Sequence, residues 1–285
     1  MRIKREKDKN EYINASNVWV RNFSKSGVKP ISLNQLIDPQ DYKLVLSNEV
    51  SNRSKNLSKI DEENFFFPKI VIVSDGYQFS TRQKILKDLP PDVAIFAVNH
   101  ALAKWELIPS RAINFYIVNN PYPECKFNLP QKHQYYPSCV ASSRTNSEFI
   151  KKYKGNLFLY EPSQQIGFGQ LANNKYCIDD YRNPICAAIG LAYQFGVQKL
   201  MLFCCDDSFE ESRQGAVQLQ NRLWTYPQHI ISHNIIDANL YWLSHQEDKE
   251  DKEVKISNYS SGPEYFNSTY INEEHEVIDF FTEVK

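Results

Sequence analysis

The chain has 285 residues, of which 42% are hydrophobic, so it is long enough for one large domain with a substantial core. Its 33 basic and 34 acidic residues give a net charge of −1, which argues against a dedicated nucleic-acid-binding protein because such proteins cluster Lys and Arg. No apolar run approaches the roughly 20 residues of a membrane span, and Met1–Tyr12 lacks the apolar centre of a secretory signal. We therefore expect a cytoplasmic protein without a transmembrane segment.

Residues 1–67 are polar, rich in Asn, Ser and Lys, and show little regular alternation. A short helix is expected near Asp41–Asn52, and Phe65-Phe66-Phe67 closes the stretch. We interpret residues 1–67 as an irregular N-terminal arm or cap and residues 68–285 as the main domain.

Three short apolar strands are predicted at the start of the main domain, at Ile70–Val73, Val93–Val98 and Ile113–Val118. Helices are expected between them at Ser80–Leu89, with Ser80 as N-cap, and at Ala101–Glu106. Each strand is followed by a small polar cluster, respectively Ser74-Asp75-Gly76, Asn99-His100 and Asn119-Asn120. Because parallel strands end at the same edge of a sheet, these clusters predict one shared ligand cleft.

The segment Pro121–Asp180 has scattered Pro, Tyr and Gly, with one probable strand at Asn156–Tyr160. Connections of this length are uncommon inside a compact domain unless they carry a function. We therefore predict a lid or inserted subdomain at about residues 121–180.

The segment Arg182–Asp207 combines a helix of small residues with a buried strand at Leu200–Cys205. Gly196 is expected to end the helix, whose buried face is formed by Ala187, Ala188, Leu191, Ala192 and Phe195. This is the repeating unit of an α/β protein with a mostly parallel, doubly wound sheet. Asp206 and Asp207 follow the strand, where they either contact a ligand or cap the next helix.

The C-terminal third contains an expected helix at Asp237–His245, a charged run at Glu247–Glu253 and a last short strand at Val254–Ser257. The tail from Asn258 to Lys285 is expected to pack back on the core. It contains hydrophobic side chains that need burial, namely Phe266, Tyr270, Ile278, Phe280 and Phe281.

Cysteine spacing argues against a metal site. No CxxC pair occurs, and the six residues are Cys125, Cys139, Cys177, Cys186, Cys204 and Cys205. Several lie in apolar segments, where a reduced Cys acts as a small hydrophobe. We expect reduced thiols, no disulfide and no metal.

A pair of histidines, His229 and His233, precedes Asp237. Two His four residues apart can share a helix face and bind zinc, but the Glu of an HExxH metalloprotease is absent. Histidine is also the side chain best suited to proton transfer near neutral pH. A structural or exposed pair is the alternative.

Ordered short motifs between about Lys69 and Ile271 resemble two Rossmann-like families. Ile70–Gly76 is similar to a first strand and its Asn-Gly-Pro-Ser turn, Tyr116–Pro121 to a Tyr-Asn-Pro-Ser element, and Arg182–Phe195 to an Arg-Ile-Thr-Ser-Gly loop with its helix. Val197–Asp206 resembles a Gly-Ile-Asp strand, and His229–His233 a His-Tyr-Ile-Gly-His stretch. The families are the bacterial lipooligosaccharide sialyltransferases and, more distantly, the archaeal 6-hydroxymethylpterin diphosphokinase-like domains.

The resemblance implies a Rossmann-like glycosyltransferase that binds a nucleotide-activated sugar, of the CMP-sialic acid type, and transfers it to an acceptor hydroxyl without a metal or other cofactor. His233 would be the catalytic base. The substrate-binding residues would be Asp75, Gly76, Asn99, Asn120, Arg182, Asn183 and Asp206. The expected partners are the nucleotide sugar, a sugar or glycan acceptor and a second copy of the chain in a homo-oligomer.

The chain also departs from the sialyltransferase pattern. The turn Asp75–Gln78 lacks the Pro-Ser, Asn183-Pro184 replaces the donor-contacting Thr-Ser, and no Tyr follows Asp206 until Tyr226. Two other readings therefore remain open. One is a diphosphokinase-like nucleotide enzyme, which would need carboxylates to hold Mg²⁺. The other is a non-catalytic binding or assembly module on the same fold.

Overall fold

The structure is a computed structural model of the chain. It describes residues 39–55, 57–60, 64–76, 78–107, 110–129, 135–162, 177–178, 180, 183–205, 236–237, 239–241, 243–244, 254–260, 265 and 268–282. Among these residues, no helix is long and apolar enough to cross a membrane.

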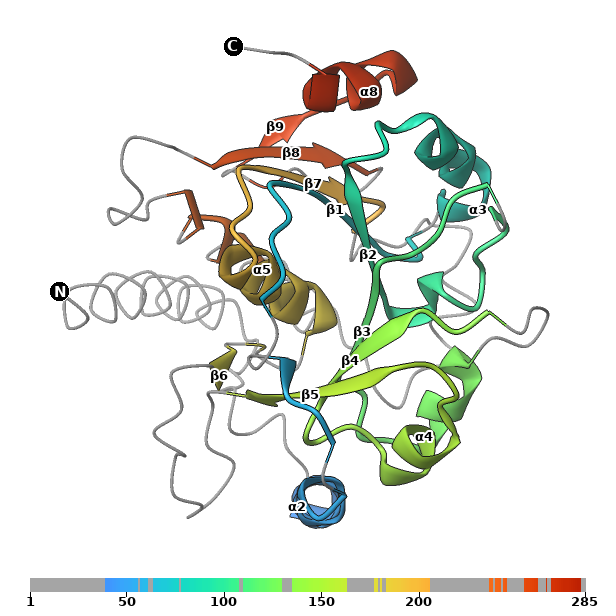
Figure 1. The fold of residues 1–285 in the computed structure, drawn as a ribbon, viewed down its shortest axis with the longest axis vertical. Coiled ribbons are helices and arrows are strands. Elements are labelled where there is room, and N and C mark those ends of the chain that lie inside the picture. The colour runs from blue at the N-terminus through green and yellow to red at the C-terminus, as the bar shows by residue number, and fades with distance from the viewer. Residues whose placement is uncertain are drawn as a thin grey trace, which may run out of the picture.

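One sheet of nine strands dominates the described part of the chain, and every pairing in it is parallel. Its order is β6-β5-β4-β3-β2-β1-β7-β8-β9 (Figure 1). The strands are β1 (Lys69–Val73), β2 (Ala94–Val98), β3 (Phe115–Val118), β4 (Ser138–Ser142), β5 (Leu157–Pro162), β6 (Cys177–Ile178), β7 (Lys199–Phe203), β8 (Lys255–Tyr259) and β9 (Thr269–Tyr270). With helices on its two faces, the protein is an α/β, Rossmann-like fold.

The strand order reverses between β1 and β7. From β1 the chain adds strands outward to β6, and it then returns to place β7 on the other side of β1. Helix α5 (Pro184–Gln194), which leads into β7, covers one face, and α3 (Phe79–Arg82), which follows β1, lies on the other (Figure 1). In open α/β sheets, ligands bind outside the carboxyl ends of the strands at such a reversal. The fold therefore points to the ends of β1 and β7.

The four strands that the sequence predicts most clearly lie side by side, in the order β3-β2-β1-β7. Successive side chains of a strand point to opposite faces of the sheet, so each strand contributes to the cores on both faces. The side chains on the α5 face are Ile70, Ile72, Leu200 and Leu202, and those on the α3 face are Val71, Val73, Met201 and Phe203. The third strand starts at Phe115 instead of Ile113, because the Tyr135 hydroxyl accepts from the Ile113 N–H and donates to the Ile113 carbonyl, each at 2.9 Å.

Helix α5 has the boundaries that its sequence suggests. Asn183 is the N-cap, Pro184 occupies the first turn, and Gly196 adopts a φ of 77° just after the helix. A left-handed φ suits Gly because it has no Cβ. The predicted apolar face is confirmed, since Ala187, Ala188, Leu191, Ala192 and Phe195 are all buried.

The segment predicted as a lid, residues 121–180, carries strands of the main sheet in its described part. It contributes β4, α4 (Ser147–Lys152), β5 and β6, and the three strands continue the main sheet. The expected strand at Asn156–Tyr160 is confirmed as β5. Strand β4 escapes sequence prediction because its sequence, SCVAS, contains a single β-branched residue. In the folded chain, β3 and β5 pair with it on both sides, and its side chains lie in the cores on the two faces of the sheet.

Residues from the expected N-terminal arm pack directly on the sheet, and residues 1–38 lie outside the described part. The predicted short helix is the 15-residue α2 (Pro39–Arg53). After it, Ser58 accepts a hydrogen bond from the Leu159 N–H at 2.9 Å, and Ile60 is 1% exposed within the core. Phe65 and Phe67 pack against the same core. The described residues of the arm therefore take part in the same hydrophobic core.

Other local predictions need correction. The segment expected as one helix at Ser80–Leu89 is the four-residue α3 followed by a 3-10 helix, Gln83–Asp88, and Gln78 instead of Ser80 is the N-cap. Both the N–H and the hydroxyl of Thr81 bond to the Gln78 carbonyl, which tightens this turn. The helix expected at Ala101–Glu106 is a 3-10 turn at Asn99–Ala101.

The C-terminal tail packs back as expected. The strand predicted at Val254–Ser257 is β8, and the short β9 and the helix α8 (Glu274–Thr282) follow it. Phe281 is 1% exposed, and Ile278 and Phe280 pack against the same core. Residues 236–237, 239–241 and 243–244 are helical, in agreement with the helix expected there.

Candidate functional site

The loops after β1, β7 and β8 are tied together by backbone hydrogen bonds. The Ser74 N–H donates to the Phe203 carbonyl at 3.0 Å, and the Gly76 N–H donates to the Cys204 carbonyl at 3.1 Å. The Cys204 N–H in turn donates to the Tyr259 carbonyl at 2.9 Å. The carboxyl ends of these strands therefore form one continuous surface at the strand reversal.

Cys204 has an unusual backbone conformation at this position. Its φ is 51°, the one positive value among the non-glycine residues that the structure describes. A non-Gly residue in this region costs roughly 1–2 kcal/mol. Such conformations concentrate at functional sites, where the surrounding structure enforces them. Here the Gly76 and Tyr259 bonds hold Cys204 in place, and the carbonyl of the next residue, Cys205, accepts from the Tyr265 hydroxyl at 2.7 Å.

Asp75 and Gly76 follow β1, at the edge where the sequence places them. The Asp75 carboxylate forms an ion pair with Lys104 Nζ at 2.9 Å, and the two side chains are 19% and 43% exposed. Lys104 comes from the turn that follows β2, so this pair links the ends of neighbouring strands. Asp75 is therefore charge-balanced within the protein.

Two consecutive asparagines follow β3, and they differ in their surroundings. The Asn120 side-chain oxygen accepts from the Tyr122 N–H at 2.9 Å, so this residue shapes its own turn. Asn119 is 8% exposed, and its amide nitrogen is buried with no hydrogen-bond partner among the described residues. A buried donor left unpaired costs about 1–3 kcal/mol, so Asn119 is the better candidate for a ligand contact.

Strand alternation is the signal that identifies Asn119. Phe115 and Ile117 face the layer of α5, and a period of two assigns Asn119 to the same layer. The motif resemblance instead selects Asn120, which follows the pattern of Tyr116 and Val118 on the other face.

Asn99 and Asn183 also lie at the carboxyl edge. Asn99 begins the 3-10 turn directly after β2. The Asn183 side-chain oxygen accepts from the Ile185 N–H at 2.8 Å as the N-cap of α5. Because α5 precedes a parallel strand, its N-terminus lies at the carboxyl edge, where the helix dipole favours anions. The other predicted site residues, Arg182, Asp206 and His233, lie outside the described residues, as do Asp207 and His229.

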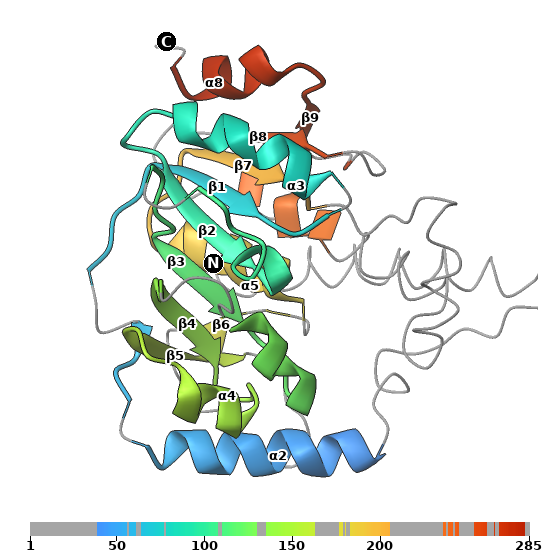
Figure 2. The same ribbon diagram turned by 90° about the vertical axis from the view of Figure 1, so that its right-hand side faces the viewer.

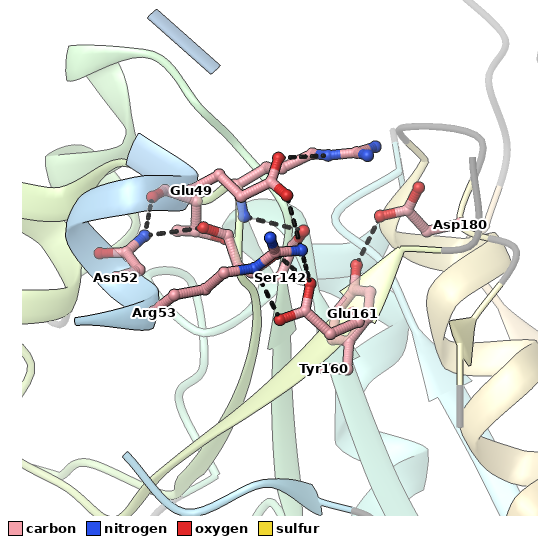
Figure 3. Close-up of polar contacts among 10 residues, drawn as sticks. Glu49, Asn52, Arg53, Ser142, Tyr160, Glu161 and Asp180 are labelled. Carbon is pink, nitrogen blue, oxygen red and sulfur yellow. Dashed lines mark hydrogen bonds and ion pairs between the residues drawn. The ribbon is translucent and has the colours of Figure 1, made fainter. Parts of the chain in front are cut away.

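A polar network that sequence reasoning missed covers the ends of β4 and β5 (Figure 3). Arg53 of α2 binds both carboxylate oxygens of Glu161, at 3.1 and 2.7 Å, and contacts Glu49 at 2.6 Å. Glu49 also contacts Arg144 Nε at 3.4 Å, and these two side chains are only 11–13% exposed. The paired charges attach α2 to the ends of β4 and β5.

Two asparagines of α2 hold the loops that follow β3 and β4. Asn48 donates to the Pro121 carbonyl at 2.9 Å and accepts from the Ser147 N–H at 3.1 Å. Asn52, one turn later and fully buried, donates to two carbonyls of the loop after β4, at 3.1 and 2.6 Å. The spacing of Asn48 and Asn52, four residues apart on one helix face, is the sequence signal for this role.

Two buried hydrogen bonds lie between the ends of β4 and β5 and the N-terminus of α5. The Arg144 N–H donates to Ser142 Oγ at 3.2 Å. Tyr160, which stands opposite Ser142 on β5, donates its hydroxyl to Asp180 Oδ2 at 2.8 Å (Figure 3). Burial raises the pKa of Tyr160 well above its usual range, and the nearby Asp180 carboxylate raises it further. Tyr160 therefore remains a neutral hydrogen-bond donor.

Replacing Tyr160 with Phe should lower the free energy of unfolding by about 1–3 kcal/mol, because the buried Asp180 carboxyl loses this hydrogen bond. Urea denaturation monitored by circular dichroism measures the change. Tyr153→Phe is the matched control, since the Tyr153 hydroxyl is also buried but donates to a neutral acceptor, the Pro137 carbonyl, at 2.6 Å. Equal losses in the two variants would show that the carboxyl acceptor adds nothing to the Tyr160 bond.

The described residues contain no group of three or more His, Cys, Asp or Glu side chains that could hold a metal ion. Five cysteines, Cys125, Cys139, Cys186, Cys204 and Cys205, are buried thiols. Burial raises the pKa of the Cys125 and Cys139 thiols and keeps them protonated.

No protein-family model matches the chain, and no curated protein matches it. Among solved structures, it is similar to the sialyltransferase CstII from Campylobacter jejuni, in complex with the substrate analogue CMP-3FNeuAc. The sequences are 14% identical, the TM-score is 0.32, and the match covers 71% of this chain and 88% of that chain. This is a distant structural relationship.

Proposed function

We propose that this protein is a glycosyltransferase that binds a nucleotide-activated sugar at the carboxyl edge of the sheet and transfers the sugar to an acceptor hydroxyl. The observation that carries the proposal is the reversal of strand order between β1 and β7, with polar residues after the adjoining strands. Such an edge is where α/β sheets bind nucleotides. The choice of sugar transfer over other nucleotide chemistry comes from the motif resemblance.

Such a ligand would have distinct contacts, some of them with described residues and others with Arg182 and His233, which lie outside the described part. Asn119, with its buried and unpartnered amide, would donate to the base or ribose, together with Asn99 at the end of β2. The N-terminus of α5 would favour the phosphate, and Arg182 would add a fixed fork of donors. His233 would take the proton from the acceptor hydroxyl.

A non-catalytic binding module remains the second candidate, and specific observations favour it. Three predicted ligand-binding side chains already have internal partners: Asp75 pairs with Lys104, while the oxygens of Asn120 and Asn183 accept from backbone N–H groups. Side chains occupied in this way stabilise loops whether or not a ligand binds.

A panel of nucleotides and nucleotide sugars in a thermal-shift assay tests the proposal. We expect one base to stabilise the protein selectively, by about 2.7 kcal/mol at a ligand concentration of 100 times Kd. Asn119→Ala should reduce this stabilisation. Asn156→Ala is the control, because Asn156 is exposed and precedes β5 at the opposite edge of the sheet. A flat panel would overturn the proposal and favour the non-catalytic module.

A further inference from the structure

Arg82, the last residue of α3, stands next to the strand reversal on the face opposite α5. Its guanidinium carbon lies 4.4 Å from the centre of the Tyr259 ring. Tyr259 is the last residue of β8, and its carbonyl accepts from the Cys204 N–H, the residue with the left-handed backbone. Figure 2 shows the face of the sheet on which α3 lies. The guanidinium is therefore positioned at the carboxyl ends of β7 and β8.

The polar environment of Arg82 differs from that of the other arginines in the described residues. Arg53 and Arg144 pair with carboxylates, and Arg111 donates to the Pro90 and Val93 carbonyls. Within the described residues, the Arg82 side chain forms no ion pair and no hydrogen bond, and its Nη1 is buried. Arg111 Nε is likewise buried without a partner there, but the Arg111 guanidinium still donates to two carbonyls. A desolvated cationic donor without an acceptor is costly, and an anion that reaches it removes that cost.

Two carboxylates act on Tyr259, but neither pairs with the Arg82 guanidinium within the described residues. Glu273 and Glu274 are exposed at the start of α8 and act on Tyr259 through their charge. Burial raises the pKa of Tyr259, and among the nearby charges Arg82 has the largest effect, which lowers this pKa. The aromatic ring holds the guanidinium plane, whose fork of N–H donors matches a phosphate.

We propose that Arg82, held against Tyr259, binds a phosphate group at the carboxyl ends of β7 and β8. This assignment rests on the proposed function for the identity of the ligand, a nucleotide whose phosphate lies at the strand reversal. The motif resemblance gives one arginine, Arg182, among the substrate-binding residues. Arg82 adds a phosphate contact from the opposite face of the sheet.

The test measures Kd for inorganic pyrophosphate and for the nucleoside monophosphates by titration calorimetry, with the wild type and the variants Arg82→Gln, Arg82→Lys and Lys199→Gln. Arg82→Gln should weaken both kinds of ligand by about 10–100-fold, the usual value of a hydrogen bond to a charged group. Arg82→Lys keeps the charge but loses the planar fork, so it should recover only part of the affinity. Circular dichroism confirms that each variant is folded.

Lys199→Gln is the matched control. Lys199 also lies over an aromatic ring, Phe280, at 5.8 Å, but it begins β7 at the opposite edge of the sheet. Its replacement removes the same charge and should leave both Kd values unchanged. If Lys199→Gln weakened binding as much as Arg82→Gln, the loss of affinity would come from the change in net charge, and the assignment of the phosphate contact to Arg82 would be overturned.

The outcomes separate this inference from the proposed function. Nucleotide binding that survives Arg82→Gln would overturn the phosphate contact and leave the function standing. Binding of pyrophosphate that depends on Arg82, without binding of any nucleotide, would support the contact and overturn the function. If neither pyrophosphate nor any nucleoside monophosphate binds, the phosphate contact and the proposed function are both overturned.

Discussion

Replacing His233 with Ala should lower the turnover of sugar transfer by about 10²–10⁴-fold while the affinity for the nucleotide stays within a few-fold of the wild type. The expectation comes from the motif that assigns the general base to His233, since a base acts on the acceptor hydroxyl and not on the bound donor. The measurement is single-turnover kinetics with a saturating nucleotide sugar, using the donor that the thermal-shift panel identifies.

Two other histidines provide controls for this experiment. His229→Ala changes the neighbouring member of the pair, and His275→Ala changes an exposed residue of α8. Both should leave turnover close to that of the wild type. If His233→Ala retains full turnover, or loses nucleotide binding to the same extent as turnover, His233 is not the base.

Replacing Phe115 with Ala should destabilise the protein by about 3–5 kcal/mol, the usual cost of removing a buried aromatic ring. Phe115 is 3% exposed and lies at the centre of an aromatic cluster. Its ring contacts those of Phe65, Phe67, Phe96, Phe158 and Phe195, at centroid distances of 5.0 to 6.5 Å. Guanidinium denaturation at equilibrium measures the loss.

Phe66→Ala is the matched control, because Phe66 is 67% exposed although it lies between two residues that join the cluster. Its removal should change the free energy of unfolding by less than about 1 kcal/mol. A loss below about 1 kcal/mol for Phe115→Ala would show that the residues on this face of the sheet rearrange to fill the space.

The run Phe65-Phe66-Phe67 illustrates what a sequence pattern conveys. An extended chain turns alternate side chains to opposite sides, so two of three identical residues pack inward and the middle one faces solvent. The same reasoning predicts the layers of β1 and β7. Local patterns of this kind are enough to predict the core strands, the helix α5 with its N-cap and Gly196 at its end, and the α/β fold class.

The sequence also predicts only part of the candidate site. Chain order and strand ends predict that Asp75, Asn99 and Asn120 lie at one edge of the sheet. They do not predict which of these side chains is already occupied. Asn120 bonds to its own turn and Asp75 to Lys104, whereas the buried amide nitrogen of Asn119 has no partner among the residues that the structure describes. Hydrogen-bond partners depend on the distances between loops, which the linear sequence does not contain.

By itself, the sequence determined the elements whose patterns are local: the apolar strands β1, β2, β3 and β7, the helix α5 and the polar residues that follow the strands. The tertiary structure alone decided that β4 belongs to the sheet, that α2 holds the loops after β3 and β4, and that Arg82 lies over Tyr259. Arg82 and Tyr259 are far apart in the chain, and a contact between distant residues forms only when strand pairing and packing bring them together. Side-chain periodicity is a property of neighbouring residues and is visible in the sequence, whereas such pairing is a property of the folded chain.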